Sequence, residues 1–228
     1  AFDYVEFLAE YAPFDLHQLD NLARAVELFP NFSAMVKIPQ DLRGHLAARA
    51  LGAGLQNLLF ADIRTPQDAL ECVRAVRPEV PGQDGQRGVG MGRDVGHVLE
   101  VGSPFFVQSA TESVIALMIE KKEAVENLEA ILAVNGVDMV QFGPADYSVS
   151  IGLAGQRQNH PAVAEAERYV IQTALKKGIH PRVELREAAG FEPYLELGVR
   201  HFNIGLDLRI LYAYYQQQGA RMRATLDS

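Results

Sequence analysis

The stretch VDMVQFGPADYS, residues 137–148, shows the pattern from which the fold is inferred. An apolar, strand-like run ends at Phe142, breaks at Gly143 and Pro144, and then enters a helix-like segment that places Asp146 near its start. Similar short runs alternate with longer amphipathic segments along the whole chain, which is typical of repeated βα units on a parallel sheet. We predict seven strands, at residues 4–8, 34–38, 57–61, 114–119, 138–142, 180–183 and 201–204.

Amphipathic segments with apolar residues at three-to-four spacing separate these strands. They predict helices at residues 15–29, 66–76, 121–134, 160–178 and 186–198, and a C-terminal helix at 206–226. Seven strands are one fewer than a closed TIM (β/α)8 barrel contains. Because the first strand begins almost at residue 1, we expect the first βα unit to lie upstream, and residues 1–228 to form a single barrel domain. A doubly wound open sheet is the alternative fold.

Composition excludes several classes of protein. The net charge is −8 and no basic block occurs, so nucleic acid is not an expected partner. No apolar run approaches the roughly 18–20 residues that span a bilayer, so no membrane association is expected. The single cysteine, Cys72, cannot form an internal disulfide and lies in a helix-like segment, which favours a reducing cytoplasm.

Two familiar motifs are absent from the sequence. GVGMGR, residues 88–93, lacks the GxGxxG spacing and the flanking strand and helix of a dinucleotide site. The histidines show no HxH or HxxxH spacing, so zinc held by histidine is not supported. The glycine-rich segment 78–104 is too long for a plain connection and is predicted to be an active-site loop.

Two acidic residues, Glu120 and Asp146, each follow a predicted strand closely. The carboxyl ends of parallel strands open on one face, so the two carboxylates are expected to converge. One or two carboxylates, with waters and substrate oxygens, suit Mg²⁺ or Mn²⁺. The alternative is that each residue only caps the helix that follows it.

The segment Gly143, Pro144, Ala145 and Asp146 predicts a substrate site beside that metal. Glycine allows a ligand to approach the backbone closely, and the free amides at a helix start can receive a carboxylate. A metal on the adjacent Asp146 could then chelate a 2-oxo acid and act as a Lewis acid that stabilises its enolate.

Residues 116–156, ALMIEKKEAVENLEAILAVNGVDMVQFGPADYSVSIGLAGQ, resemble the metal-binding core of the HpcH/HpaI aldolase and citrate lyase family. FDYVEFLAEYAPFDL, QRGVG, HPAVAEAERYVI and YLELGVRHFNIGLDLRIL fall in the family's order, so the resemblance covers nearly the whole chain. It implies a class II pyruvate-dependent aldolase, such as one acting on 4-hydroxy-2-oxoheptanedioate or on 2-keto-3-deoxy sugar acids. It also implies Glu120 and Asp146 as metal ligands, and a homo-oligomer, a trimer or a hexamer built from trimers, in which the last helix packs on a neighbour.

The sequence departs from the family pattern at three places. Glu10-Tyr11 stands where the family carries a Glu-His pair, Lys37 replaces the substrate-gripping arginine, and no acid occurs near Leu51-Gly52. Lys37 can still attract a keto oxygen by its charge. Proton transfer then falls to Tyr11, Glu10 or a metal-bound water. A phenol is a poor base near neutral pH unless a neighbour lowers its pKa, and Tyr11 could instead only fill the rim of the site.

The resulting prediction is a metal-dependent lyase that joins or cleaves a 2-oxo acid and an aldehyde through a pyruvate enolate. Three alternatives stay open. Lys37 could form a Schiff base, as the lysine of a class I aldolase does. The protein could instead be a 2-oxo acid decarboxylase or another lyase on the same scaffold, or a non-catalytic protein that binds metal and 2-oxo acid.

Overall fold

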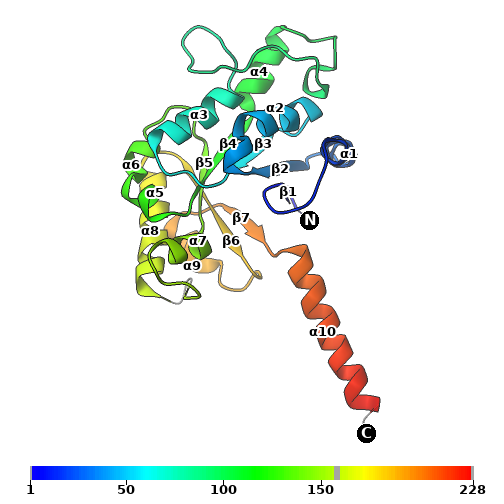
Figure 1. Cartoon of the computed structure of the whole chain (residues 1–228), viewed down its shortest axis with the longest axis vertical. Helices are drawn as coiled ribbons and strands as arrows, with labels where there is room; N and C mark the ends of the chain where they lie inside the picture. Colours follow the sequence, from blue (N-terminus) through cyan, green and yellow to red (C-terminus); the bar gives the residue numbers. More distant parts are fainter. Residues whose placement is uncertain (1, 157–159, 227–228) are drawn as a thin grey trace. The chain divides into compact units, whose positions relative to one another are not determined.

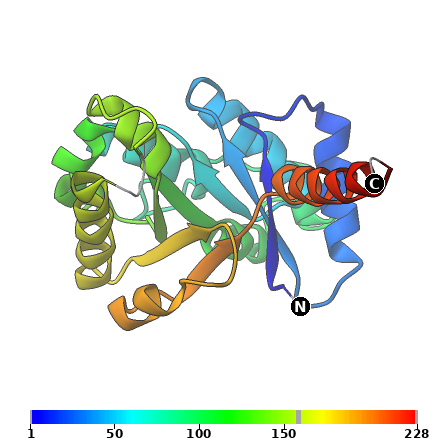
Figure 2. The ribbon, with the colours of Figure 1, turned by 90° about the horizontal axis from the view of Figure 1, so that it is seen from below.

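The computed structural model describes residues 2–156 and 160–226, which form an α/β fold around a parallel sheet (Figures 1 and 2). Seven strands follow one another in chain order. They are β1 (Tyr4–Leu8), β2 (Ser33–Ile38), β3 (Asn57–Phe60), β4 (Val114–Ile119), β5 (Met139–Phe142), β6 (His180–Leu185) and β7 (His201–Ile204). All seven predicted strands are therefore confirmed, three of them with the predicted bounds.

The strand order separates the two predicted folds. A doubly wound sheet reverses its strand order at a switch point, whereas here the order runs from β1 to β7 without reversal, so that alternative is wrong. Closure into a barrel is not observed either. The two ends of the sheet are β1 and β7, and in the part of the chain described there is no eighth strand to join them.

The chain divides into two compact units, residues 1–181 and 182–228. The first unit contains β1 to β5, the start of β6 and most of the helices. Its helices are α1 (Leu16–Glu27), α2 (Arg43–Ala53), α3 (Pro66–Val76), α4 (Pro104–Glu112), α5 (Lys122–Glu126), α6 (Leu128–Ile131), α7 (Pro144–Ser150) and α8 (Pro161–Lys176), with 3-10 turns η1 (Gln40–Leu42) and η2 (Arg93–Val95). The second unit contains the rest of β6, which pairs with β7, and helices α9 (Glu192–Leu197) and α10 (Asp207–Leu226).

Helix α3 shows how local sequence sets these elements. Thr65 accepts a hydrogen bond from the Asp68 amide while the Asp68 carboxylate accepts one from the Thr65 amide, so the helix begins with a capping box followed by Pro66. Its buried face includes Ala69, Cys72, Val73 and Val76, at helical spacing. Burial raises the pKa of the Cys72 thiol to about 12, and no disulfide is formed.

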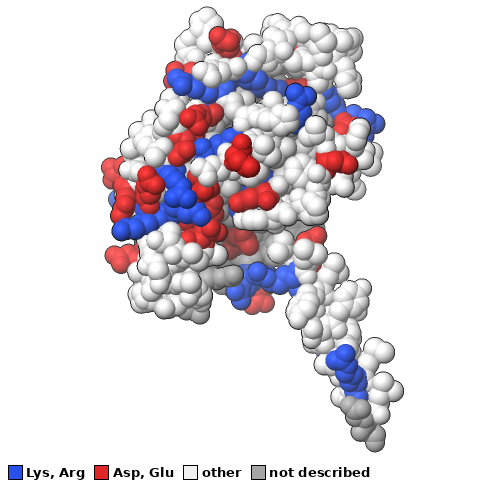
Figure 3. Space-filling model, in the orientation of Figure 1, with Lys and Arg blue, Asp and Glu red and all other residues white. Residues whose placement is uncertain are grey.

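The predicted helix at 121–134 is interrupted at Asn127 and becomes α5 and α6. The Asn127 side chain donates a hydrogen bond to the Arg64 carbonyl, 3.0 Å away, so a contact with a distant loop holds the break. No described helix is long and apolar enough to cross a membrane. On the face drawn in Figure 3, acidic and basic side chains are interspersed and no extended basic patch is seen.

Candidate active site

In the first unit, successive side chains along a strand alternate between the two faces of the sheet, so the core and the site lie on different faces. Val36 and Ile38 belong to the large core cluster shared with the helices, whereas Met35 and Met118 belong to a smaller cluster on the other face of the sheet. Lys37 continues the row of Met35, and Glu120 continues the row of Met118 just beyond the end of β4. The alternation therefore places Lys37 and Glu120 on one face of the sheet, and the charge of each shifts the pKa of the other.

Glu120 is buried at the carboxyl end of β4, with 4% of its surface exposed. Its Oε1 accepts a hydrogen bond of 2.8 Å from the Asp62 amide. Burial raises the pKa of Glu120, although the charge of Lys37 opposes this effect. The helix-cap alternative is not observed, because the N-cap of α5 is Lys121.

Gly143, at the end of β5, packs directly against Glu120. A Cβ added to Gly143 would lie 2.6 Å from the Glu120 Cβ and 2.8 Å from its Oε2, so no other residue fits without displacing the carboxylate. This contact accounts for a glycine at position 143, the N-cap of α7, and Pro144 follows it as the first residue of the helix.

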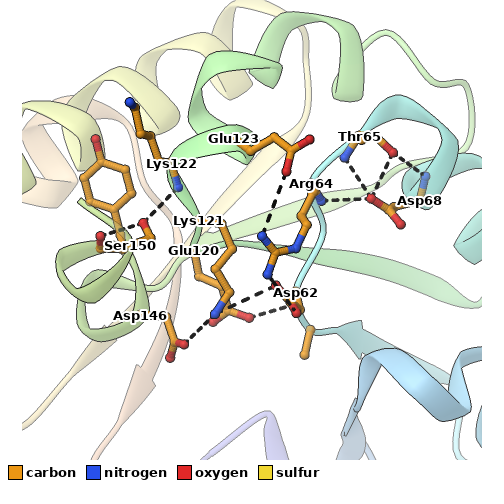
Figure 4. A network of polar contacts seen from close by, with 12 residues as sticks. Asp62, Arg64, Thr65, Asp68, Glu120, Lys121, Lys122, Glu123, Asp146 and Ser150 are labelled. Atoms are coloured by element: carbon orange, nitrogen blue, oxygen red, sulfur yellow. Dashed lines mark hydrogen bonds and ion pairs between the residues drawn. The ribbon is translucent and has the colours of Figure 1, made fainter. Parts of the chain in front are cut away.

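Asp146 lies in the first turn of α7, with its side chain 47% exposed. Its Oδ1 accepts a hydrogen bond of 2.6 Å from the Lys121 Nζ rather than capping α7, whose N-cap is Gly143. The negative charge of Asp146 raises the pKa of Glu120. Ile119 of β4 pairs with Phe142 of β5, so the two predicted metal ligands lie just beyond neighbouring strand ends, as Figure 4 shows.

Lys37, Glu10 and Tyr11 form a second cluster at the end of β2. The Lys37 Nζ lies 2.6 Å from Glu10 Oε2 and donates a 2.9 Å hydrogen bond to the Tyr11 hydroxyl. Burial alone would lower the pKa of Lys37, but the charges of Glu120 and Glu10 and the Tyr11 hydroxyl raise it above its usual value. Partial burial likewise raises the pKa of Tyr11, and Lys37 does not offset this. Tyr11 therefore keeps its proton near neutral pH.

Two further charged residues, Asp62 and Lys121, lie at this edge and were not predicted. Asp62 follows β3 with a left-handed backbone, φ 55°. Its Oδ1 lies 3.1 Å from Arg64 Nη2 and 3.8 Å from Lys121 Nζ. The rule that singled out Glu120, an acid just beyond a strand end, would also have found Asp62. Lys121 gave no comparable signal, because a lysine at a helix start is ordinarily solvated.

The carboxylates at this edge fit a divalent cation in kind and in charge. Glu10, Asp62, Glu120 and Asp146 stand against the ammonium groups of Lys37 and Lys121, with Arg64 at the side of Asp62. No group of three or more His, Cys, Asp or Glu residues within 2–156 and 160–226 is arranged to hold a metal. Two carboxylates are enough for Mg²⁺ or Mn²⁺, which take their remaining ligands from water and substrate.

Part of the predicted active-site loop borders a different feature. A cavity of about 900 Å³ is lined by α2, α3 and residues of the segment 86–94. Neither Glu120 nor Asp146 lines it, so this cavity is separate from the acidic site.

Comparison with known proteins agrees with the geometry. A model of the HpcH/HpaI aldolase/citrate lyase family matches residues 2–212. The chain belongs to this family. A 4-hydroxy-2-oxo-heptane-1,7-dioate aldolase of Escherichia coli is 31% identical over 98% of this chain and 83% of its own length. A 5-keto-4-deoxy-D-glucarate aldolase of Klebsiella pneumoniae is 30% identical over 95% of this chain and 82% of its own.

A solved structure shows the same fold. The crystal structure of a HpcH/HpaI aldolase/citrate lyase family protein from Burkholderia cenocepacia has a TM-score of 0.86 and 29% identity, covering 97% of this chain and 86% of that one. The two relatives from Escherichia coli and Klebsiella pneumoniae are both named as aldolases.

Proposed function

We propose that this protein is a divalent-metal-dependent carbon–carbon lyase, an aldolase that cleaves or forms 4-hydroxy-2-oxo acids through a pyruvate enolate. The proposal depends chiefly on the convergence of a buried Glu120 with Asp146 at the carboxyl ends of β4 and β5. The names of the relatives, both aldolases of 2-oxo or keto-deoxy acids, support the substrate class.

Glu120 and Asp146 would hold Mg²⁺ or Mn²⁺, which when bound supplies Lewis-acid polarisation of the keto group. In the segment Gly143, Pro144, Ala145 and Asp146, the amides of the last two residues would receive the carboxylate of the oxo acid, because the Gly143 amide donates to the Ile119 carbonyl and proline has no N–H. The close contact of Gly143 with Glu120 supports this placement, because it sets the start of α7 beside the proposed ligand.

Lys37 would stabilise the negative charge that develops on the keto oxygen. In the cleavage direction the bond between C3 and C4 breaks, its electron pair forms the enolate of pyruvate, and the 4-hydroxyl loses its proton to become the aldehyde. The raised pKa of Lys37 keeps it cationic, which suits charge stabilisation. A Schiff-base lysine needs a lowered pKa, so that alternative is disfavoured.

Glu10 is the better candidate to accept the hydroxyl proton, because the pKa of Tyr11 is raised and its phenol stays protonated near neutral pH. A protonated Tyr11, which cannot act as a base, favours decarboxylation of a 2-oxo acid as the second candidate function. Loss of CO₂ from C3 of a 2-oxo diacid such as oxaloacetate leaves its electron pair on C3, so it yields the same enolate and needs no base for a hydroxyl group.

We further propose that the seven strands form seven of the eight strands of a TIM-type barrel. We also propose that the protein is a cytoplasmic homo-oligomer, a trimer or hexamer, and that α10 packs on a neighbouring copy. None of the residues of α10 is buried, and Ile210, Leu211, Tyr212 and Tyr215 are exposed on it. Such a helix lacks the burial that normally stabilises helices in proteins.

The test is pyruvate release from 4-hydroxy-2-oxo-heptane-1,7-dioate by metal-stripped protein, with and without added Mg²⁺ or Mn²⁺. We expect metal to restore activity, and Glu120→Gln and Asp146→Asn each to lower kcat by about a hundredfold or more. Glu123→Gln is the matched control, because its side chain is 51% exposed and its carboxylate lies 3.9 Å from Arg64.

Unchanged activity in Glu120→Gln or Asp146→Asn would reject the metal assignment. Oxaloacetate decarboxylation without aldol cleavage would favour the second candidate. Pyruvate binding without exchange of its methyl protons would identify a protein that binds the oxo acid without turnover.

A further inference from the structure

Lys121 occupies an unusual position for a lysine at the start of a helix. It follows Glu120 directly and adopts an extended backbone as the N-cap of α5, so its side chain turns toward the acidic site. Its Nζ lies 2.6 Å from Asp146 Oδ1 and 3.8 Å from Asp62 Oδ1, and its side chain is 19% exposed. Figure 4 shows this ammonium between the two carboxylates and beside Glu120.

A divalent ion and this ammonium would compete for the same carboxylate. Mg²⁺ binds a carboxylate oxygen at about 2.0–2.1 Å, which would bring it within a few ångströms of a Lys121 Nζ that stays on Asp146. Two cations at such a separation repel one another strongly in a partly buried site. The metal therefore requires Lys121 to leave Asp146.

Asp62 provides a second acceptor for the displaced ammonium. Its Oδ1 is buried and forms an ion pair with Arg64 Nη2 at 3.1 Å, but it accepts no hydrogen bond among the residues that the structure describes, so it has room for a further donor. Asp62 is held in place by its backbone, because its amide donates to Glu120 and its carbonyl accepts from Arg43 Nη2. A lysine has a flexible four-carbon stem, so rotation of its side chain can move the ammonium from one carboxylate to the other.

We propose that Lys121 is an internal competitor of the metal, which neutralises Asp146 in the metal-free protein and moves toward Asp62 when a divalent ion binds. Lys121 is then a positioning residue that sets the metal affinity of the site. This inference rests on the proposed function, since it takes Glu120 and Asp146 as the metal ligands.

The experiment measures Mn²⁺ affinity directly, by titration calorimetry of the metal-stripped full chain and by the electron paramagnetic resonance signal of free Mn²⁺. Lys121→Met is expected to bind Mn²⁺ about tenfold tighter or more, because the repulsion and the competing ion pair are both removed. Lys121→Gln keeps a polar side chain and should change the affinity in the same direction.

Lys122→Met is the matched control. The Lys122 side chain is 63% exposed, and its ammonium lies 3.6 Å from Glu126 on the same helix. The Mn²⁺ affinity of Lys122→Met should therefore stay within about twofold of the parent. A general loss of structure cannot tighten binding, so a gain in Lys121→Met and Lys121→Gln alone supports the proposal. Mn²⁺ affinity in both Lys121 variants equal to or weaker than in the parent would overturn it. If the parent and all variants bind no Mn²⁺, the proposed function fails together with this inference.

Discussion

The two ends of strands β4 and β5 both carry buried charge, but they use it differently. At the amino ends, Arg77 donates hydrogen bonds to the carbonyls of Ala110, Thr111, Ser113 and Gly136 and to the Asp138 carboxylate. Asp138 Oδ2 also accepts from the Ile115 amide. This one guanidinium thereby ties α3 and α4 to the starts of both strands.

At the carboxyl ends, the buried Glu120 accepts a hydrogen bond from the Asp62 amide and lies near the opposite charge of Lys37 and the like charges of Asp146 and Glu10. Burial raises the pKa of Glu120, and the opposite charge of Lys37 only partly offsets this. The amino ends thus use charge to stabilise the fold, whereas the carboxyl ends keep a carboxylate buried where its ionised form is disfavoured. Such an arrangement is expected of a site that binds a cation.

The largest effect on stability should come from the amino ends. Arg77→Met would leave Asp138 and several carbonyls without their donor, so we expect a loss of about 3 kcal/mol in the free energy of unfolding. Urea unfolding at neutral pH measures it. Arg74→Met, three residues earlier on α3 and less buried, is the matched control and should cost under about 0.5 kcal/mol. Equal losses in the two variants would contradict the role assigned to Arg77.

A smaller effect on stability is expected from the ion pair of Arg43 and Asp68, which lies near the carboxyl ends of the strands. It tests whether an ion pair in this region can stabilise the fold rather than serve the metal site. Arg43 lies 2.8 Å from Asp68 and also donates to the Asp62 carbonyl, so this pair fastens the loop after β3. Burial alone would raise the pKa of Asp68, but hydrogen bonds from Arg43 and from the Thr65 amide lower it. Because the pKa of Asp68 is lower in the folded state, its ionised carboxylate stabilises the fold at pH values above the ordinary pKa of 3.8. This stabilisation is lost as the pH falls through the lowered pKa.

Asp68→Asn should therefore lower the free energy of unfolding by about 1–2 kcal/mol near neutral pH, and the difference from the parent should shrink in acid. Thermal unfolding as a function of pH measures both effects. Glu71→Gln is the control, because its exposed carboxylate lies 3.9 Å from Arg43 and should contribute little. A deficit in Asp68→Asn that is independent of pH would show that the charge of Asp68 is not what stabilises α3.

Most of the fold of the first unit follows from local sequence. The strands are short apolar runs bounded by glycine, proline or polar residues, so their places are clear without tertiary information. The break at Asn127 is not locally encoded, because it depends on a hydrogen bond to Arg64, 63 residues earlier. That β1 and β7 are not paired in the structure could not be inferred either, because strand count alone does not fix which edges pair.

The site was predictable to the extent that it depends on strand ends. Glu120 and Asp146 could be paired because parallel strands bring their carboxyl ends together. Their roles as ligands stay predictions, as do those of Lys37, Tyr11 and Glu10. Lys121 could not be found this way, because the direction of its side chain depends on the extended N-cap backbone and on the position of α7.

The smallest change in the free energy of unfolding is expected from Glu120→Gln in metal-free protein. Its sign tests whether the carboxyl ends of the strands differ from the amino ends in their use of charge. A carboxyl group with a raised folded-state pKa destabilises the fold wherever it is ionised in the unfolded chain, so the neutral amide removes that penalty. We expect unchanged stability or a gain of up to about 1 kcal/mol near neutral pH.

Asp138→Asn, at the amino end of the neighbouring strand, should instead lose stability, because Arg77 loses its charged acceptor. Below the ordinary glutamate pKa of 4.5 the gain from Glu120→Gln should vanish, because the parent residue is then protonated in both states. Urea unfolding of the two variants at neutral and acidic pH measures these differences. If both variants lose the same stability near neutral pH, the two ends of the strands use charge alike and the contrast drawn between them is wrong.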